Sequence, residues 1–361
     1  MGRAEQSVIS VLLFLGFGAG CVAETVATSC DRIQCGPGQR CVDSTCVDDC
    51  RDECASSGLR DCVDTAHFRD CGNFDDDACL EWSAAAPCEQ PLSCQGSGLC
   101  LSSSPCEAGY VPIAAGRFQM GSELEETWRM DDEHRHEVEL DQAFCIKAHE
   151  LTQGEFEALM GYAPATFRDC GADCPVENIS WHESASACNA LSAAQGLPLC
   201  YDCEGLGPTA LCTRLEASCR GYRLPTEAEW EFAARAGTTS AFVSGPNEDA
   251  ACADPILDEL GWYCGNAAQS PQAVGSKRAN GWGLFDTAGN VFEWVEDYYG
   301  DYPDSFVLNP TGPSEGQVKV LRGGAFQSEA WACRSANRTF VEADFRSNFI
   351  GLRPLRWTAL P

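Results

Sequence analysis

Basic residues are scarce in this chain. Its 361 residues include 24 Lys and Arg against 54 Asp and Glu, which gives a formal net charge of −30 at pH 7. A protein that binds nucleic acid needs clustered Lys and Arg to neutralise phosphates. Nucleic acid is therefore not an expected partner. We interpret the acidity mainly as a solubilising surface, with cation binding by part of it as the alternative.

Histidine is scarce as well. The chain has five histidines, and none of them stands at a spacing from cysteine that is typical of a zinc finger. Two of them, His134 and His136, belong to an acidic segment and are expected at the surface. Zinc is therefore a weak explanation for the many cysteines of this chain.

Long apolar runs are missing beyond the N-terminus. The run at residues 8–17 is too short to span a bilayer, and small residues follow it up to Cys21. This pattern is typical of a signal peptide and is similar to a bacterial lipobox. We predict a lipoprotein-type signal peptide at residues 1–20, with Cys21 as the lipidated first residue. The protein would be anchored in the membrane of the cell envelope by its lipid, or be secreted after plain cleavage; an uncleaved anchor is a third reading.

Cysteine, in contrast, is abundant. The chain contains 25 cysteines, a density typical of an oxidising compartment in which disulfides persist. Thirteen of them lie at residues 22–106, a segment with few periodic apolar runs. Disulfides must replace a hydrophobic core there. We predict a disulfide-stapled stalk that acts as a spacer, with a ligand-binding module as the alternative.

Eleven more cysteines lie from Cys145 to Cys333. Because both groups are odd in number, complete pairing requires a bridge between them, or else one free thiol in each. Cys170 and Cys174 are close enough in sequence for a local disulfide. Four further cysteines are expected to pair among themselves or with Cys188: Cys200, Cys203, Cys212 and Cys219.

Residues 107–361 have the composition of a packed α+β domain that is rich in loops. Capping-box patterns, with Thr or Ser followed three residues later by Glu, predict helices at 152–160, 180–192 and 226–235. The alternation at 318–322 predicts a strand. In the third helix, three glutamates are expected on a solvated face or in the cap: Glu227, Glu229 and Glu231.

Several sequence blocks occur in order within this domain. They are GRFQMGS at 116–122, YRLPTEAEWEFAAR at 222–235, NGWGLFDTAGNVFEW at 280–294, VLRGGAF at 320–326 and GLR at 351–353. Together they resemble the formylglycine-generating-enzyme (sulfatase-modifying factor) family over residues 110–357. The resemblance implies that family's fold, which is similar to the C-type lectin fold and has little regular secondary structure.

One block carries a candidate metal site. Two carboxylates with a Gly-Asn turn between them can converge on a hard cation together with main-chain carbonyls. The resemblance implies a structural calcium site that uses the side chains of Asp286 and Glu293 and the carbonyls of Gly289 and Val291. A network of hydrogen bonds that stabilises the turn is the alternative.

The resemblance also implies an oxidation. Active members convert a sulfatase cysteine to formylglycine with O2 and a copper(I) ion held by two thiolates, the ligands that Cu(I) favours. Cys333 matches the second thiolate and is the candidate catalytic residue, but Ser328 stands at the first position.

The chain is therefore expected to be an exported binding or structural module without the full copper pair. Its ligand would be a protein, a peptide or a glycan, and Cys333 would be buried or disulfide-bonded. The alternatives are a formylglycine-generating oxidase that uses copper, and a different activity in the same cleft.

Overall fold

The computed structural model describes residues 106–216, 218–249 and 251–358, and the backbone of short strands between residues 39 and 101. The predicted signal peptide at 1–20 and Cys21 lie outside the described residues. Contacts divide the chain into the units Met1–Cys50 and Arg51–Pro361. No described helix has the length and apolar character needed to cross a bilayer.

The described part of the cysteine-rich segment forms short antiparallel ladders. In the first unit, β1 (Gln39–Val42) pairs with β2 (Thr45–Asp48). In the second unit, β4 pairs with β3, β5 and β6, and β7 pairs with β8. The bounds of these strands are β3 Arg60–Asp64, β4 His67–Gly72, β5 Glu81–Trp82, β6 Ala86–Pro87, β7 Ser93–Gln95 and β8 Leu99–Leu101.

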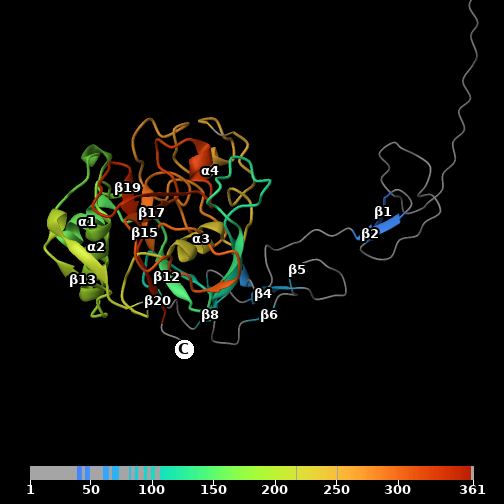
Figure 1. Cartoon of the computed structure of the whole chain (residues 1–361), viewed down its shortest axis with the longest axis horizontal. Helices are drawn as coiled ribbons and strands as arrows, with labels where there is room; N and C mark the ends of the chain where they lie inside the picture. Colours follow the sequence, from blue (N-terminus) through green and yellow to red (C-terminus); the bar gives the residue numbers. More distant parts are fainter. Residues whose placement is uncertain are drawn as a thin grey trace, which may run out of the picture. The chain divides into compact units, whose positions relative to one another are not determined.

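The main domain is built on small sheets (Figure 1). One has the strand order β18-β17-β15-β19, with β15 and β19 parallel and the other pairs antiparallel. The others have the orders β10-β11-β16, β20-β12-β9 and β13-β14. The bounds are β9 Tyr110–Ile113, β10 Gly116–Met120, β11 His136–Leu140, β12 Phe144–Lys147, β13 Tyr201–Glu204, β14 Leu211–Arg214, β15 Phe292–Tyr298, β16 Val307–Leu308, β17 Val318–Arg322, β18 Arg338–Glu342, β19 Ile350–Leu352 and β20 Leu355–Trp357.

The three predicted helices are confirmed, as is the strand at 318–322. They are α1 (Gln153–Met160), α2 (Trp181–Ala194) and α3 (Glu227–Arg235), and each begins with a complete capping box. A short α4 (Leu257–Leu260) and three 3-10 turns, η1 (Arg168–Cys170), η2 (Gly207–Thr209) and η3 (Ala330–Cys333), complete the helical structure of the described residues. The fold is mixed α+β with few helices, as the sequence predicts.

Helix α3 lies at the centre of the domain (Figure 1), in contact with β10, β15 and β17. Its two aromatic residues pack against different sheets. Phe232 packs against Phe118 on β10, with ring centroids 5.2 Å apart, whereas Trp230 clusters with Val295 and Val320. Each large side chain buried in this way contributes about 1.5–3 kcal/mol. The helix therefore joins two parts of the core and leaves no face to solvent.

One histidine was predicted wrongly. His134 is exposed as expected, but His136 is buried at 5% exposure. The alternation of β11 turns His136 inward, where its ring lies 4.9 Å from that of Tyr302. Strand register therefore outweighs the acidic surroundings that suggested a surface position.

Five disulfides join described cysteines. Cys106–Cys145 links the two cysteine groups, as their odd numbers allow. The local disulfide Cys170–Cys174 is confirmed, and the four cysteines of the insertion pair among themselves as Cys200–Cys219 and Cys203–Cys212. Cys252–Cys264 is the fifth. Cys188 and Cys333 are free and buried.

Candidate functional site

Helix α3 carries three buried carboxylates. Glu227, Glu229 and Glu231 are 3%, 3% and 0% exposed, so the expectation of a solvated face was wrong; Glu229 does act in the cap. A buried carboxylate is costly unless it is paired and hydrogen-bonded. Because the helix is buried on all sides, its negative charges must be neutralised by partners inside the protein.

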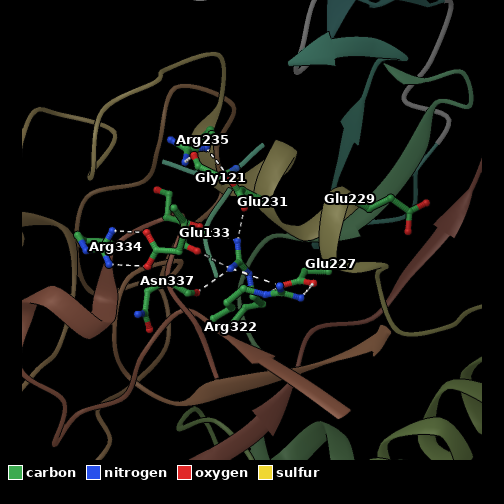
Figure 2. A network of polar contacts seen from close by, with 12 residues as sticks. Gly121, Glu133, Glu227, Glu229, Glu231, Arg235, Arg322, Arg334 and Asn337 are labelled. Carbon is green, nitrogen blue, oxygen red and sulfur yellow. Dashed lines mark hydrogen bonds and ion pairs between the residues drawn. The ribbon is translucent and has the colours of Figure 1, made fainter. Parts of the chain in front are cut away.

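Two of these carboxylates face a group of arginines (Figure 2). Arg322 donates to Glu231, and Arg235 donates to the same carboxylate over 2.8 Å. Arg338 holds Glu227 through two hydrogen bonds of 2.9 and 2.7 Å. Both acids are therefore neutralised in place.

The third carboxylate, Glu229, points to the other side of the helix (Figure 2). Arg223 holds it through two hydrogen bonds of 2.6 Å, and Trp357 Nε1 donates to it over 2.8 Å. Burial raises the pKa of Glu229, but the Arg223 charge and these hydrogen bonds bring its pKa below the usual value. A further pair, Glu133 with Arg334, repeats the arrangement next to the first group. These pairs form a structural network.

A second group of buried carboxylates consists of Glu150, Asp286 and Glu293, and Glu293 lies at the start of β15. Asp286 is 1% exposed, and its Oδ2 accepts a hydrogen bond from Gly275 N over 2.6 Å. Asp286 Oδ1 has no hydrogen-bond partner, and neither has either side-chain oxygen of the fully buried Glu150. Burial, and then the charge of Asp286, raise the pKa of Glu150 well above its ordinary value.

Glu293, the other predicted ligand, is already paired. Arg353 Nη2 donates to Glu293 Oε1 over 2.7 Å, and Trp230 Nε1 donates to Oε2 over the same distance. Burial also raises the pKa of Asp286. Arg353 thus donates to Glu293, while only its charge acts on Glu150 and Asp286. No described N–H group donates to Oδ1 of Asp286 or to either side-chain oxygen of Glu150.

These leftover oxygens fit a hard cation such as calcium, which takes oxygen ligands. Within the described residues, no three acidic, cysteine or histidine side chains are arranged to hold a metal, in keeping with the pairing of Glu293 with Arg353. Calcium here would rest on Asp286, Glu150 and the predicted carbonyls of Gly289 and Val291. Sequence reasoning did not suggest Glu150 as a candidate ligand, because it lies far from Asp286 along the chain and no local spacing connects the two.

The predicted catalytic residue, Cys333, has apolar surroundings. Cys333 ends η3, has no exposed surface and belongs to an apolar cluster with Phe242 and Leu257. Burial raises the pKa of its thiol to about 12. A Cβ on Gly324 would lie 2.5 Å from Cys333 Sγ, so the Gly-Gly turn is what allows the thiol to pack there. Cys333 is thus buried, as expected, but is not in a disulfide.

Ser328 is only partly buried, and its hydroxyl accepts a hydrogen bond from Ala325 N over 3.0 Å. The other free thiol of the described residues, Cys188, belongs to a separate core cluster. Two thiolates that could hold copper(I) are therefore not brought together by the described residues. A single buried thiol and a hydroxyl do not fit a soft ion that favours thiolate ligands.

A groove of about 490 Å³ opens beside η3 and is lined by Met130, Trp331 and Phe340. Met130 and Phe340 are each 45% exposed. Two acidic residues, Asp131 and Asp132, also line it, and neither forms an ion pair with a described residue. Asp132 accepts a hydrogen bond from Tyr299 over 2.7 Å, and Arg338, which also lines the groove, is paired with Glu227. The groove therefore combines exposed apolar side chains with two acids.

The chain matches the family model of the sulfatase-modifying factor enzyme 1-like domain over residues 102–357. It therefore belongs to this family, as the sequence blocks and the α+β fold indicate. The match begins close to Cys106 and ends within β20.

Individual relatives agree with this assignment. The chain is 30% identical to the formylglycine-generating enzyme of Streptomyces coelicolor, over 68% of this chain and 88% of that protein. It is 29% identical to the chaperone protein LppX of Paenibacillus barcinonensis, over 50% of this chain and 80% of that protein. Among solved structures it is similar to Treponema denticola variable protein 1, with 31% identity, a TM-score of 0.60 and coverage of 68% of this chain and 94% of that chain.

Proposed function

We propose that this protein is an exported binding module of the sulfatase-modifying factor family that does not carry out copper-dependent oxidation. The observation that supports this most strongly is the single buried thiol of Cys333, with Ser328 at the partner position. Copper(I) favours two thiolate ligands, and the partner position of Cys333 offers a hydroxyl group.

The oxidase alternative is tested with purified protein, Cu(I), O2 and a peptide that contains Cys-x-Pro-x-Arg. We expect the mass of the peptide to stay unchanged, while the Streptomyces coelicolor enzyme, as the positive control, converts the thiol to an aldehyde. Conversion by this protein at a rate comparable to that of the control would establish the oxidase function instead.

We place the binding role in the groove beside η3. Its exposed apolar side chains and its two acids, neither of which is in an ion pair within the described residues, favour a polypeptide segment that is both apolar and basic. The net charge of −30 attracts such a segment from a distance. The similarity to a protein named as a chaperone supports a polypeptide ligand over a glycan.

Fluorescence anisotropy with two labelled peptides tests this site. A peptide of alternating Lys and Leu is expected to bind, and one of alternating Glu and Leu is not. The substitution Phe340→Ser should weaken binding about tenfold, because it removes an aromatic wall. The matched control is Phe306→Ser, which changes a phenylalanine of similar exposure outside the groove. Equal binding of both peptides, or equal effects of both substitutions, would contradict the proposal.

Calcium has a structural role in this proposal. It would neutralise Glu150 and Asp286, which have no arginine partner within the described residues, and hold the loop before β15 in place. A bound ion stabilises the folded state by about 2.7 kcal/mol at a hundredfold excess over its Kd. EGTA should therefore lower the thermal unfolding temperature, and added calcium should restore it.

Export and anchoring are proposed on the disulfides of the described domain and on the N-terminal pattern. Expression of the full chain in a bacterium supplied with labelled palmitate should label the wild type at Cys21 and leave Cys21→Ala unlabelled. Labelling of both proteins, or a mature protein that keeps residues 1–20, would contradict the lipoprotein assignment.

A further inference from the structure

A second cavity lies apart from both Cys333 and the groove beside η3. It has a volume of about 390 Å³ and shares no lining residue with that groove. Strands β15 and β17 contribute Glu296 and Lys319, and β14 contributes Arg214. A cavity of this size is in the range of small-molecule binding sites.

The charges that line this cavity do not balance. Arg223 is paired with Glu229, and Arg214 Nη1 lies 3.0 Å from Glu296 Oε2. Lys319, in contrast, has no carboxylate partner of this kind among the described residues. Within the described residues, no carboxylate oxygen lies within 4.0 Å of Lys319 Nζ. The lining thus carries one positive charge in excess, in a chain whose net charge is −30.

The surroundings of the Lys319 ammonium reinforce this imbalance. It donates one hydrogen bond of 2.7 Å, to Glu296 O, although an ammonium group has three donors. Its Nζ also lies 3.5 Å from the ring centre of Tyr298 and 4.3 Å from that of Trp181. The carboxyl groups of Glu296 and Asp297 act on it through their charge, without an ion pair within 4.0 Å. Burial lowers the pKa of Lys319 to about 8, so it is still mostly protonated at neutral pH.

A second buried cation points to the same kind of ligand. Arg223 Nε has no hydrogen-bond partner, although the side chain is 1% exposed and lines the cavity. Arg214, in contrast, keeps a fifth of its side chain exposed. The cavity therefore combines one accessible guanidinium with two buried cations that have donors to spare.

The uncharged lining includes polar side chains such as Gln142 and Thr226, but part of it is apolar or aromatic. Leu140, Pro310 and Pro313 form part of the wall, together with the rings of Tyr298 and Trp357. A ligand that fills this space must place an apolar or aromatic body against these side chains. A fully polar anion such as phosphate would leave this part of the cavity unfilled.

We propose that this cavity binds a small organic anion whose carboxylate faces Lys319 and Arg214 and whose apolar or aromatic body packs against Trp357 and the two prolines. The site is independent of the groove beside η3. It uses a part of the chain, the β13–β14 hairpin, that two disulfides hold in place.

Isothermal titration calorimetry with N-acetyl-L-phenylalanine tests the proposal, and the neutral N-acetyl-L-phenylalaninamide is the matched control. We expect the acid to bind with a Kd of about 1 mM or lower, and about 10- to 100-fold more tightly than the amide, because a charge-assisted contact is lost in the amide. Binding should weaken as the pH rises through 8, since Lys319 then loses its proton and the facing Asp297, whose pKa burial raises to about 8, becomes negatively charged. Absence of binding, or equal binding of acid and amide, would overturn the proposal.

Two variants locate the site. Lys319→Met should weaken binding of the acid about tenfold or more, whereas Lys277→Met should not. Lys277 is a suitable control because its ammonium also donates to one main-chain oxygen and lies over an indole ring, but outside the cavity. If Lys319→Met does not fold, Ser314→Trp, at an exposed position of the rim, should abolish binding by filling the cavity. Wild-type affinity in Ser314→Trp would place the ligand elsewhere and refute the site.

Discussion

Two groups of buried carboxylates in this domain have opposite surroundings. On α3, Glu227, Glu229 and Glu231 each face at least one arginine at hydrogen-bonding distance. Near the start of β15, no described arginine donates a hydrogen bond to Glu150 or Asp286, and the two carboxyl groups lie against each other. Both groups are equally buried, so burial does not distinguish them.

The difference shows how a structural acid can be told from a ligand. A buried carboxylate that is paired with arginine on both oxygens has no capacity left for an ion. An acid that keeps its charge without a partner would cost several kcal/mol, and it either takes up a proton or needs a cation from outside the chain. By this criterion α3 belongs to the architecture of the domain, and Glu150 with Asp286 forms a candidate site.

The largest effect is expected at the centre of the paired group. Glu231→Gln should destabilise the protein by about 3–5 kcal/mol, because it leaves Arg322 and Arg235 buried without their carboxylate. Glu137→Gln, at a half-exposed position on β11, is the control and should change the free energy of unfolding by less than about 0.5 kcal/mol. Urea denaturation measures both. Similar effects of the two substitutions would show that the network is not structural.

An intermediate effect is expected at Asp297, a buried acid beside the paired group that has no arginine of its own. Burial, and then the charge of Glu227, raise the pKa of Asp297 to about 8. The folded state therefore binds a proton that the unfolded state releases near its ordinary value of 3.8, and stability is lost as the pH rises between these two values.

Asp297→Asn should remove this loss, because an amide stays neutral and can still accept the 2.8 Å hydrogen bond from Glu227 N. We expect the variant to be more stable than the wild type by about 2 kcal/mol at pH 7 and of equal stability at pH 4. Denaturation curves at the two pH values check this. A gain that is the same at both pH values would exclude the charge of Asp297 as the cause.

The smallest effect is expected at Glu150. In the presence of EGTA, Glu150→Gln should change the free energy of unfolding by less than about 1 kcal/mol or raise it slightly, because no arginine of the described residues donates a hydrogen bond to this carboxyl group. The same chemical change thus has a large effect on α3 and a small one here. A loss as large as that of Glu231→Gln would remove the distinction between the two groups.

Much of this arrangement could be predicted from local sequence. The capping boxes give the starts of three helices, because Thr or Ser and the following Glu satisfy main-chain groups within one turn. The family blocks give the fold and mark Cys333 and Asp286. The partners of the buried acids could not be predicted, since Arg322 and Arg338 come from strands about a hundred residues after α3. For the same reason the place of Glu150 beside Asp286 became clear only in three dimensions. The inward turn of His136 follows instead from the alternation of β11, which the acidic surroundings concealed.

Calorimetric titration of the metal-free protein with calcium tests the comparison most directly. The wild type should bind one calcium ion, Glu150→Gln and Asp286→Asn should lose this binding, and the control Glu157→Gln, at an exposed position on α1, should keep it. Calcium binding that persists unchanged in Glu150→Gln and Asp286→Asn, or a wild type that binds none, would contradict the assignment of the unpaired carboxylates to a cation site.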